Sequence, residues 1–533
     1  MARVSPTLKQ DIRDYFLAYD KFMITEERIA YLKTPLHEWK EVYKIKWDSS
    51  PYVFFNDLIA CLPVAGLKAA LQAAGASFGV QDEPRVATLC ARADEEAAYF
   101  AEPGADWLTG HYQEQIDWLE TTRYQIDNRF VKLTLLIDQG PEVQGLRFVQ
   151  DSQHDKYDNL NTLLGKAGDG AFVLLGGPGS GKTTLLRRLQ LERAWEGLKA
   201  PSDHRIPFFV SLNGYRGRSA DPPDPMAWLA KEWQQRYPAL PAFEPLLKTG
   251  RLLLLLDGLN EIPYRSQEDY QEQVHTWQSF LQYAVPLGNL AVFSCRSLDY
   301  SAPLSSEAVP VRQVRVEPLS PAQIESFLRV YLTDEDSERV WHRLRQSEQQ
   351  LTLFATPFFL RLLVAQVATT GQPLTSRVAL LTGFVRRALH REVERRQSLF
   401  VPGTLLTAND IRQVTQNKWP TEFALPRQGL LMPKLAQLAY TMQADHINTN
   451  DRFARGAGQV RVSEEVALDI LDHPQAAALI QAGIQLNVLD EDLIQLEVTY
   501  FHQLLQEYFA ARVLAENPEP ARVAVPWRAD ELT

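Results

Sequence analysis

Short apolar runs recur along the central part of this sequence, and stretches long enough to form a helix separate them. The runs lie at residues 171–175, 206–212, 252–256, 290–293 and 311–316. Strands buried on both faces of a parallel sheet have such continuous apolar runs, and crossover helices connect them. The pattern therefore predicts an α/β fold with a doubly wound parallel sheet over residues 126–317.

The pattern before this region is helical. Apolar residues recur three and four positions apart at 54–67 and again at 112–119, which is the spacing of one face of an α-helix. We expect residues 1–125 to form a mostly α-helical N-terminal domain.

The pattern after this region is helical again. At Ser320 a serine that can cap a helix precedes a proline at the first helical position, and we expect a helical lid domain over 318–400. Within 401–515 two apolar runs flank the acidic residues 490–492. This hairpin signal among helices predicts a winged-helix domain. The remaining tail, 516–533, is interpreted as the start of a missing sensor region.

Composition and charge exclude several classes of protein. The chain has 533 residues and a net charge of −11, which is the wrong sign for general binding to nucleic acid or to an anionic membrane. Its three cysteines are too few for a disulfide framework, which fits a reducing compartment. No apolar run approaches the roughly 20 residues of a membrane span, and residues 1–20 lack the apolar core of a signal peptide. We expect a cytoplasmic protein that does not associate with membranes.

A glycine-rich loop directly follows the first central run. The residues that match G-x-x-x-x-G-K-[ST], together with the next threonine, are Gly176, Gly177, Pro178, Gly179, Ser180, Gly181, Lys182, Thr183 and Thr184. Such a loop turns its backbone N–H groups toward phosphate oxygens, and the following helix adds partial positive charge. Lys182 is predicted to bind the β- and γ-phosphates, and Thr183 to bind magnesium. The alternative, a glycine-rich turn without a nucleotide, is disfavoured by the strand and helix on either side.

Two further runs end in charged residues. The run 252–256 is followed by Asp257 and Glu261, and a carboxylate at the end of a buried strand is costly unless a positive group meets it. Asp257 is predicted to hold magnesium, and Glu261 to polarise the attacking water. Arg296 follows the run 290–293 and is predicted to contact the γ-phosphate. The alternatives are a simple Asp-Gly turn and a solvated arginine.

Together these motifs resemble the NACHT branch of the STAND family of signal-transducing NTPases. Two further parts of the sequence extend the likeness, namely 319–324 with 355–360, and 500–511. The resemblance covers roughly residues 125–515 and does not include the first 120 or so. It implies an NLR-like, prokaryotic P-loop NTPase that binds ATP or ADP with Mg²⁺.

The resemblance also implies roles for residues away from the three strand ends. Pro357 would lie near the adenine, and Phe130 and Val131 would line the base pocket. His502 would contact the β-phosphate of ADP and lock a closed form, whereas its alternative is an ordinary histidine at a helix N-terminus. Asn260 stands where the family commonly has a second acid, which favours slow hydrolysis.

For the whole protein, the resemblance implies a signalling switch. ADP would hold a closed state, ATP with Mg²⁺ would hold an open state that oligomerises, and hydrolysis would be slow. Residues 1–125 would serve as the effector or adaptor, and a role in antiviral defence would make the activating ligand phage-derived. Two alternatives remain: a sustained ATPase motor or remodelling enzyme, and a catalytically silent nucleotide-binding scaffold.

Overall fold

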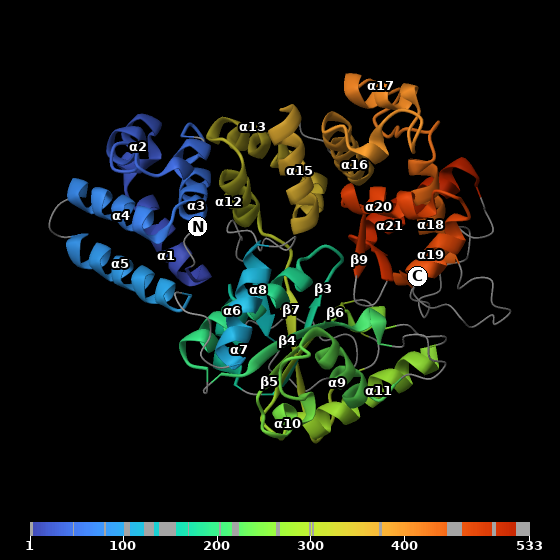
Figure 1. Cartoon of the computed structure of the whole chain (residues 1–533), viewed down its shortest axis with the longest axis horizontal. Helices are drawn as coiled ribbons and strands as arrows, with labels where there is room; N and C mark the ends of the chain where they lie inside the picture. Colours follow the sequence, from blue (N-terminus) through green and yellow to red (C-terminus); the bar gives the residue numbers. More distant parts are fainter. Residues whose placement is uncertain are drawn as a thin grey trace.

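The chain folds into a sheet domain with three helical units arranged around one side of it (Figure 1). The computed structural model describes residues 4–45, 47–78, 82–100, 107–121, 133–137, 156–168, 170–201, 204–215, 223–262, 267–297, 300, 303–371, 376–444, 461–492 and 497–518. The N-terminal helices lie at the upper left of the view, and the C-terminal helices at the upper right.

In the described residues, the sheet has seven strands in the order β2-β1-β7-β3-β6-β5-β4. The five predicted strands are present and pair in parallel. They are β3 (Ala171–Gly176), β4 (Ile206–Ser211), β5 (Leu252–Asp257), β6 (Leu290–Arg296) and β7 (Val311–Val316). Two short strands that were not predicted, β1 (Leu135–Ile137) and β2 (Lys156–Tyr157), extend the sheet in antiparallel fashion beside β7.

Helices cover both faces of the sheet. Along β3 the side chains alternate, so that Phe172 and Leu174 belong to one apolar cluster while Val173 and Leu175 belong to the other. The first cluster includes α7 (Leu160–Ala167) and the N-terminal half of α8 (Lys182–Lys199). The second includes α9 (Pro225–Arg236), α10 (Phe243–Lys248) and α11 (Gln267–Ala284). A parallel sheet with helices on both faces is the doubly wound arrangement.

The described part of the N-terminal region is helical, as predicted. Its helices are α1 (Pro6–Leu17), α2 (Thr25–Leu32), α3 (Pro51–Cys61), α4 (Val64–Phe78) and α5 (Glu83–Ala98), with short 3-10 segments at Asp20–Met23 and Lys40–Lys44. We call this unit the N-terminal bundle. Helix α6 (Trp107–Thr121), which we expected in the same domain, packs on α8 instead. The ring of Tyr112 lies directly over Gly197, which leaves no room for a Cβ at that position.

Helices also follow the sheet. The first set, the middle helical unit, consists of α12 (Pro321–Tyr331), α13 (Asp334–Leu344), α14 (Glu348–Phe354), α15 (Pro357–Thr370) and α16 (Arg377–Glu394). Ser320 caps α12 as predicted, and Gln323 completes a reciprocal capping box with it. Within the described chain no single helix is long and apolar enough to cross a membrane, although the sharply bent pair α14–α15 passes by length and composition alone.

The last part of the described chain forms the C-terminal unit. A 3-10 turn, Ser398–Phe400, precedes its helices α17 (Ala408–Gln416), α18 (Leu431–Ala444), α19 (Glu464–Leu471), α20 (Ala476–Gln485) and α21 (Gln503–Glu516). A hairpin is formed by β9 (Leu489–Asp492) and β10 (Glu497–Tyr500). It lies a few residues later than predicted, because the acidic residues expected between the two strands belong to β9 and pair with β10. A third strand, β8 (Arg461–Ser463), pairs with β10 and was not predicted. One continuous apolar cluster joins this unit to the middle helical unit and the sheet.

Candidate nucleotide-binding site

The glycine-rich loop connects the end of β3 to the start of α8. Gly179 (φ 72°) and Gly181 (φ 92°) adopt the left-handed backbone conformation that favours glycine. The Nζ atom of Lys182 donates hydrogen bonds to the carbonyl oxygens of Gly176 at 2.8 Å and Gly177 at 3.0 Å. Burial lowers the pKa of Lys182, and the charge of Asp257 opposes this shift. The loop therefore holds a partly desolvated cation at its centre.

Several other residues of the loop are exposed to solvent, and one has a buried hydroxyl group without a hydrogen-bond partner among the described residues. Gly177, Pro178, Thr183 and Thr184 are exposed. The hydroxyl oxygen of Ser180 is buried and, among the residues that the structure describes, has no hydrogen-bond partner. A buried polar atom without a partner is unusual in a folded protein. Together with the glycines and Lys182, it fits a loop that binds phosphate groups.

Asp257 and Thr183 meet at the mouth of this loop. The hydroxyl of Thr183 donates to Oδ2 of Asp257 at 2.8 Å. The hydroxyl of Ser294 on β6 donates to the other carboxylate oxygen and accepts the backbone N–H of Gly258 at 2.9 Å. The described residues include no cluster of three or more His, Cys, Asp or Glu side chains that could hold a metal ion. Thr183 and Asp257 fit a magnesium ion that takes its other ligands from nucleotide oxygens and water.

The ends of β5 and β6 are joined beside the loop. Gly258 (φ 82°) starts a 3-10 turn, Leu259–Glu261, and the Glu261 carboxylate folds back toward it. Asn260 accepts the backbone N–H of Arg296 at 3.0 Å, so this residue ties the two strand ends together. Arg296 also pairs with Gly176 across β3 and β6. The three predicted strand ends therefore lie at one edge of the sheet.

Helix α15 reaches the same loop from the middle helical unit. Pro357 is its first residue, and the backbone N–H of Phe358 donates to the carbonyl oxygen of Gly179 at 3.2 Å. A Cβ added at Gly179 would lie 2.9 Å from Cβ of Phe358. Pro357 is thus beside the phosphate loop, whereas Phe130 and Val131 lie outside the described residues.

His502 reaches this junction from the C-terminal unit. Its ring stacks on that of Phe358, with the ring centroids 4.1 Å apart and an angle of 19° between the planes. It also caps α21, because Nδ1 accepts the backbone N–H of Leu504 at 3.1 Å. Burial and the charges of Arg296 and Lys182 lower the pKa of His502 to about 4. The imidazole is therefore neutral at neutral pH, and Nε2 carries its proton.

Glu507 brings a carboxylate to the same region. Burial raises the pKa of this α21 residue, and the charge of Arg296 opposes the shift. Sequence reasoning missed Glu507, Phe358 and Ser294 as site residues. The first two stand within the stretches 500–511 and 355–360 that carried the family resemblance. Ser294 is the only polar residue in the buried part of β6, and that isolated hydroxyl was an available signal.

The phosphate loop, the acid at the end of the neighbouring strand and the parallel sheet define a P-loop nucleoside triphosphatase domain. Residues 171–335 match the family model of the NACHT domain. The matched segment runs from β3 into α13 and includes Lys182, Asp257 and Arg296. The chain therefore carries a NACHT domain, as its motifs led us to expect.

Comparisons with whole chains give weaker likenesses. The ORC1 protein of Aeropyrum pernix, in a structure of its complex with DNA, is 13% identical to this chain. The matched region covers 68% of this chain and 92% of the ORC1 chain, with a TM-score of 0.26. ORC2 of the same organism is also 13% identical, and the match covers 66% of this chain and 91% of the ORC2 chain, with a TM-score of 0.24. A Thermotoga maritima RuvB variant is 10% identical, with coverages of 63% and 86% and a TM-score of 0.20. At such scores these likenesses carry no functional argument. The comparison with curated proteins finds no significant match.

Proposed function

We propose that this protein is a nucleotide-dependent signalling switch. ADP holds a closed state, and ATP with Mg²⁺ favours an open state that oligomerises. The observation that carries the proposal is the position of Phe358, which contacts Gly179 of the phosphate loop and stacks on His502. Three units of the chain meet there, so a ligand in the loop lies where it can act on all of them.

The charges around the loop support discrimination between the two nucleotides. A ligand shifts a conformational equilibrium only by its different affinities for the two states. His502 offers a neutral N–H donor, which suits a diphosphate in the closed state. Glu507 places a carboxylate near Arg296, and the negative charge of a further phosphate would repel it. ATP would therefore disfavour the position of the start of α21 beside the phosphate loop, whereas ADP would preserve it.

Slow hydrolysis is consistent with the acids around the loop. Bound magnesium would neutralise phosphate charge, and Thr183 and Asp257 would hold it. Glu261 would orient the attacking water, and Arg296 would bind the γ-phosphate. Asn260 already holds the backbone of Arg296 and cannot act as a base. With one candidate base, the site suits a switch that hydrolyses ATP slowly better than a motor that hydrolyses it continuously.

The other expected features belong to the same proposal. The middle helical unit acts as a lid and the C-terminal unit as a winged helix, with Pro357 beside the base. The N-terminal bundle acts as effector or adaptor, and opening allows protomers to assemble in the cytoplasm. A defence role against phage, with a phage-derived activating ligand, has the support of the sequence resemblance to the NACHT branch alone.

ADP release measured by stopped flow, with a fluorescent ADP, tests the switch. His502→Ala should release ADP about tenfold faster, because a lost hydrogen bond to a charged group costs on the order of 1.5 kcal/mol. His275→Ala, on the exposed face of α11, should release ADP at the wild-type rate. Equal rates for the wild type and His502→Ala would contradict the proposal. Steady ATP turnover in the ordinary enzyme range, about 1–10³ s⁻¹, would favour the motor alternative.

A further inference from the structure

A buried hydroxyl group lies directly beside the carboxylate that is predicted to hold magnesium. Ser294 stands on β6 between Phe293 and Cys295, and all three residues are at most 1% exposed. Leu256 pairs with Phe293 across β5 and β6. The next residue along each strand therefore brings Asp257 beside Ser294. A polar group in so buried a strand must find its hydrogen-bond partners within the protein.

The hydroxyl of Ser294 makes two hydrogen bonds whose directions are fixed. It accepts the backbone N–H of Gly258 at 2.9 Å. A hydroxyl has one proton, and this one is donated to Oδ1 of Asp257. Gly258 is buried, and a buried backbone N–H needs a partner. Ser294 therefore cannot turn away from Asp257 without leaving that N–H unpaired.

The two oxygens of the Asp257 carboxylate are held by different parts of the fold. Oδ1 accepts the proton of Ser294 from the sheet, and Oδ2 accepts that of Thr183 from the start of α8. Thr183 is exposed, whereas Ser294 is buried. An exposed hydroxyl can exchange its partner for water at small cost, but a buried one cannot. Ser294 is therefore the fixed support of the carboxylate, and it leaves Oδ2 on the side of the phosphate loop.

The same hydroxyl supports the turn that leads to the candidate base. Gly258, whose N–H it accepts, precedes the 3-10 turn Leu259–Glu261. Ser294 thus holds both the predicted magnesium ligand and the beginning of this turn. Residues that hydrogen-bond a metal-binding carboxylate typically change metal affinity about 10–100-fold when they are removed.

We propose that Ser294 is a positioning residue for the magnesium site. By donating to one oxygen of Asp257 it orients the carboxylate, and it thereby sets the affinity of the nucleotide complex for a divalent cation. Ser294 acts through Asp257 and contacts neither the cation nor the nucleotide. This inference rests on the part of the proposed function that places magnesium at Thr183 and Asp257, and it does not depend on the open and closed states.

Binding of Mn²⁺ to the ADP complex of the full chain tests this inference. Mn²⁺ takes the same oxygen ligands as Mg²⁺, and the free ion is counted by its electron paramagnetic resonance signal. With protein in excess over ADP, Ser294→Ala should weaken Mn²⁺ binding about 10–100-fold. The affinity for ADP in excess EDTA, measured by calorimetry, should stay within about twofold of the wild type. A residue that only packed the sheet would not separate these two affinities.

Ser294→Cys distinguishes the hydrogen bond from the filling of space. Cysteine keeps the size of the side chain but offers only a weak S–H donor, so Mn²⁺ binding should weaken as in Ser294→Ala. Because it leaves no empty space in the sheet, this variant also serves if Ser294→Ala does not fold. Wild-type Mn²⁺ affinity in Ser294→Cys would show that Ser294 only fills space, and it would overturn the inference.

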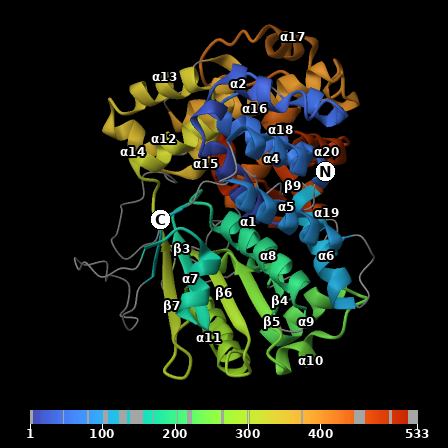
Figure 2. The same cartoon turned by 90° about the vertical axis from the view of Figure 1, so that its left-hand side faces the viewer.

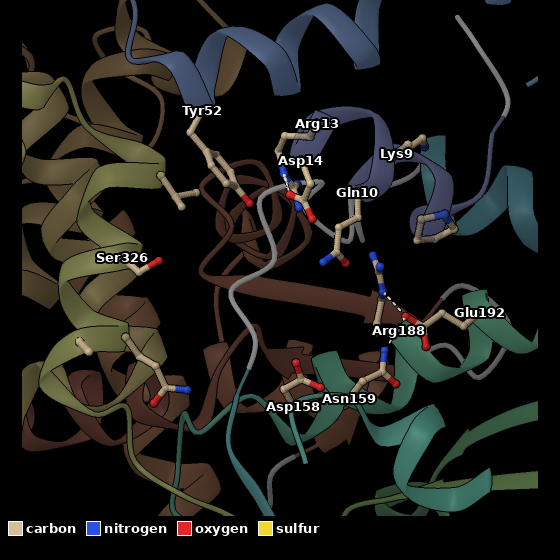
Figure 3. Close-up of a pocket in the computed structure, with 14 residues that line it drawn as sticks. Lys9, Gln10, Arg13, Asp14, Tyr52, Asp158, Asn159, Arg188, Glu192 and Ser326 are labelled. Carbon is tan, nitrogen blue, oxygen red and sulfur yellow. Dashed lines mark hydrogen bonds and ion pairs between the residues drawn. The ribbon is translucent and has the colours of Figure 1, made fainter. Parts of the chain in front are cut away.

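Ser326→Ala is the matched serine control. Ser326 lies on α12 and faces a separate cavity of about 390 Å³ between α1, α3, α12 and the start of α7 and α8 (Figure 3). Neither Asp257 nor Thr183 lines that cavity. The variant should bind Mn²⁺ and ADP as the wild type does, and a loss of Mn²⁺ affinity equal to that of Ser294→Ala would count against a specific role for Ser294.

Asp257→Asn separates this inference from the proposed magnesium site. It should weaken Mn²⁺ binding at least as much as Ser294→Ala, because it removes the charge of the carboxylate. If Asp257→Asn loses Mn²⁺ affinity while both Ser294 variants keep it, Ser294 is not a positioning residue and the site stands. If Asp257→Asn also keeps wild-type affinity, the proposed site is wrong and this inference falls with it. If Ser294→Ala weakens ADP binding in EDTA as much as Mn²⁺ binding, Ser294 supports the whole loop, and the inference is overturned.

Discussion

The backbone N–H of Phe358 donates to the carbonyl oxygen of Gly179 at 3.2 Å, so the first turn of α15 rests directly on the phosphate loop. The other side of Phe358 packs on His502. A residue far along the chain thereby connects the loop to α21. The views in Figure 1 and Figure 2 both place α15 and the C-terminal unit on the same side of the sheet. Any change in the loop that displaces Phe358 must also disturb His502.

A methyl group at position 179 should separate these elements. In Gly179→Ala the new Cβ would lie 2.9 Å from Phe358 Cβ and 3.2 Å from Thr356 Cγ2, at a φ of 72°. The left-handed backbone alone costs about 1–2 kcal/mol for a residue with a side chain. We expect a fall of about 2–4 °C in the apparent Tm of the nucleotide-free protein, measured by scanning calorimetry.

Gly177→Ala is the control for this change. No atom lies within 4 Å of a Cβ built at position 177, so the nucleotide-free protein should keep its wild-type Tm. Equal Tm values for Gly179→Ala and the wild type would show that α15 does not depend on close contact with the loop.

Acid should open the junction between α15 and α21. The pKa of His502 falls from 6.5 to about 4 in the folded, nucleotide-free chain, so its neutral form is favoured there. Burial of the neutral His502 ring therefore contributes fully to the stability of the folded chain above pH 6.5, and this contribution is lost as the pH falls toward 4. Hydroxyl-radical footprinting of Phe358 between pH 7.5 and 5 should show rising exposure.

His502→Gln keeps a hydrogen-bond donor but cannot become charged, and it should remove this pH dependence. His111 needs separate treatment, because burial also lowers its pKa to about 4 and overall stability will fall with pH in both proteins. The local exposure of Phe358, measured where circular dichroism shows an intact fold, distinguishes the two effects. An identical pH profile in the variant would exclude His502 as the titrating group.

Glu507 should set the preference between the two nucleotides. Glu507→Gln removes the carboxylate near Arg296 and with it the repulsion of an additional phosphate. We expect the ratio of ATP to ADP affinity, measured by calorimetry, to rise about five- to tenfold. Glu516→Gln, at the far end of α21 and paired with Arg427, should leave the ratio unchanged. A fall in the ratio for Glu507→Gln would reverse the proposed role.

Glu261 should affect turnover without affecting nucleotide affinity. Because it is the candidate base for the attacking water, Glu261→Gln should slow single-turnover ATP hydrolysis by about 10²–10⁴-fold. ADP affinity should stay within about twofold of the wild type, since the residue orients water rather than the diphosphate. Glu272→Gln, on the exposed side of α11, is the control. Unchanged hydrolysis in Glu261→Gln would assign the base to another residue.

Local sequence signals predicted the five parallel strands of the large sheet and the three strand ends that carry the site. Each of those features lies within a few consecutive residues, where apolar runs and a glycine motif are direct evidence. The two-residue strand β2 and the three-residue strands β1 and β8 are too short to produce a pattern. The packing of α6 on α8 depends on the fit of Tyr112 over Gly197, which no periodicity encodes.

The composition of the site was only partly predictable for the same reason. Lys182, Asp257 and Arg296 follow buried strands, so the sheet itself brings them together. Phe358 and Glu507 reach the site through the packing of helices that are distant in sequence. His502 could be predicted from the family resemblance, whereas its stack on Phe358 is a property of the folded chain.

The most direct test of the switch is the hydrogen exchange rate of the Phe358 amide, because that N–H is the donor to Gly179. It is measured by mass spectrometry on the full chain with ADP and with an ATP analogue plus Mg²⁺. We predict slow exchange with ADP and exchange at least about tenfold faster with the ATP analogue, since opening breaks this hydrogen bond. Exchange at the same rate with both nucleotides would contradict the account.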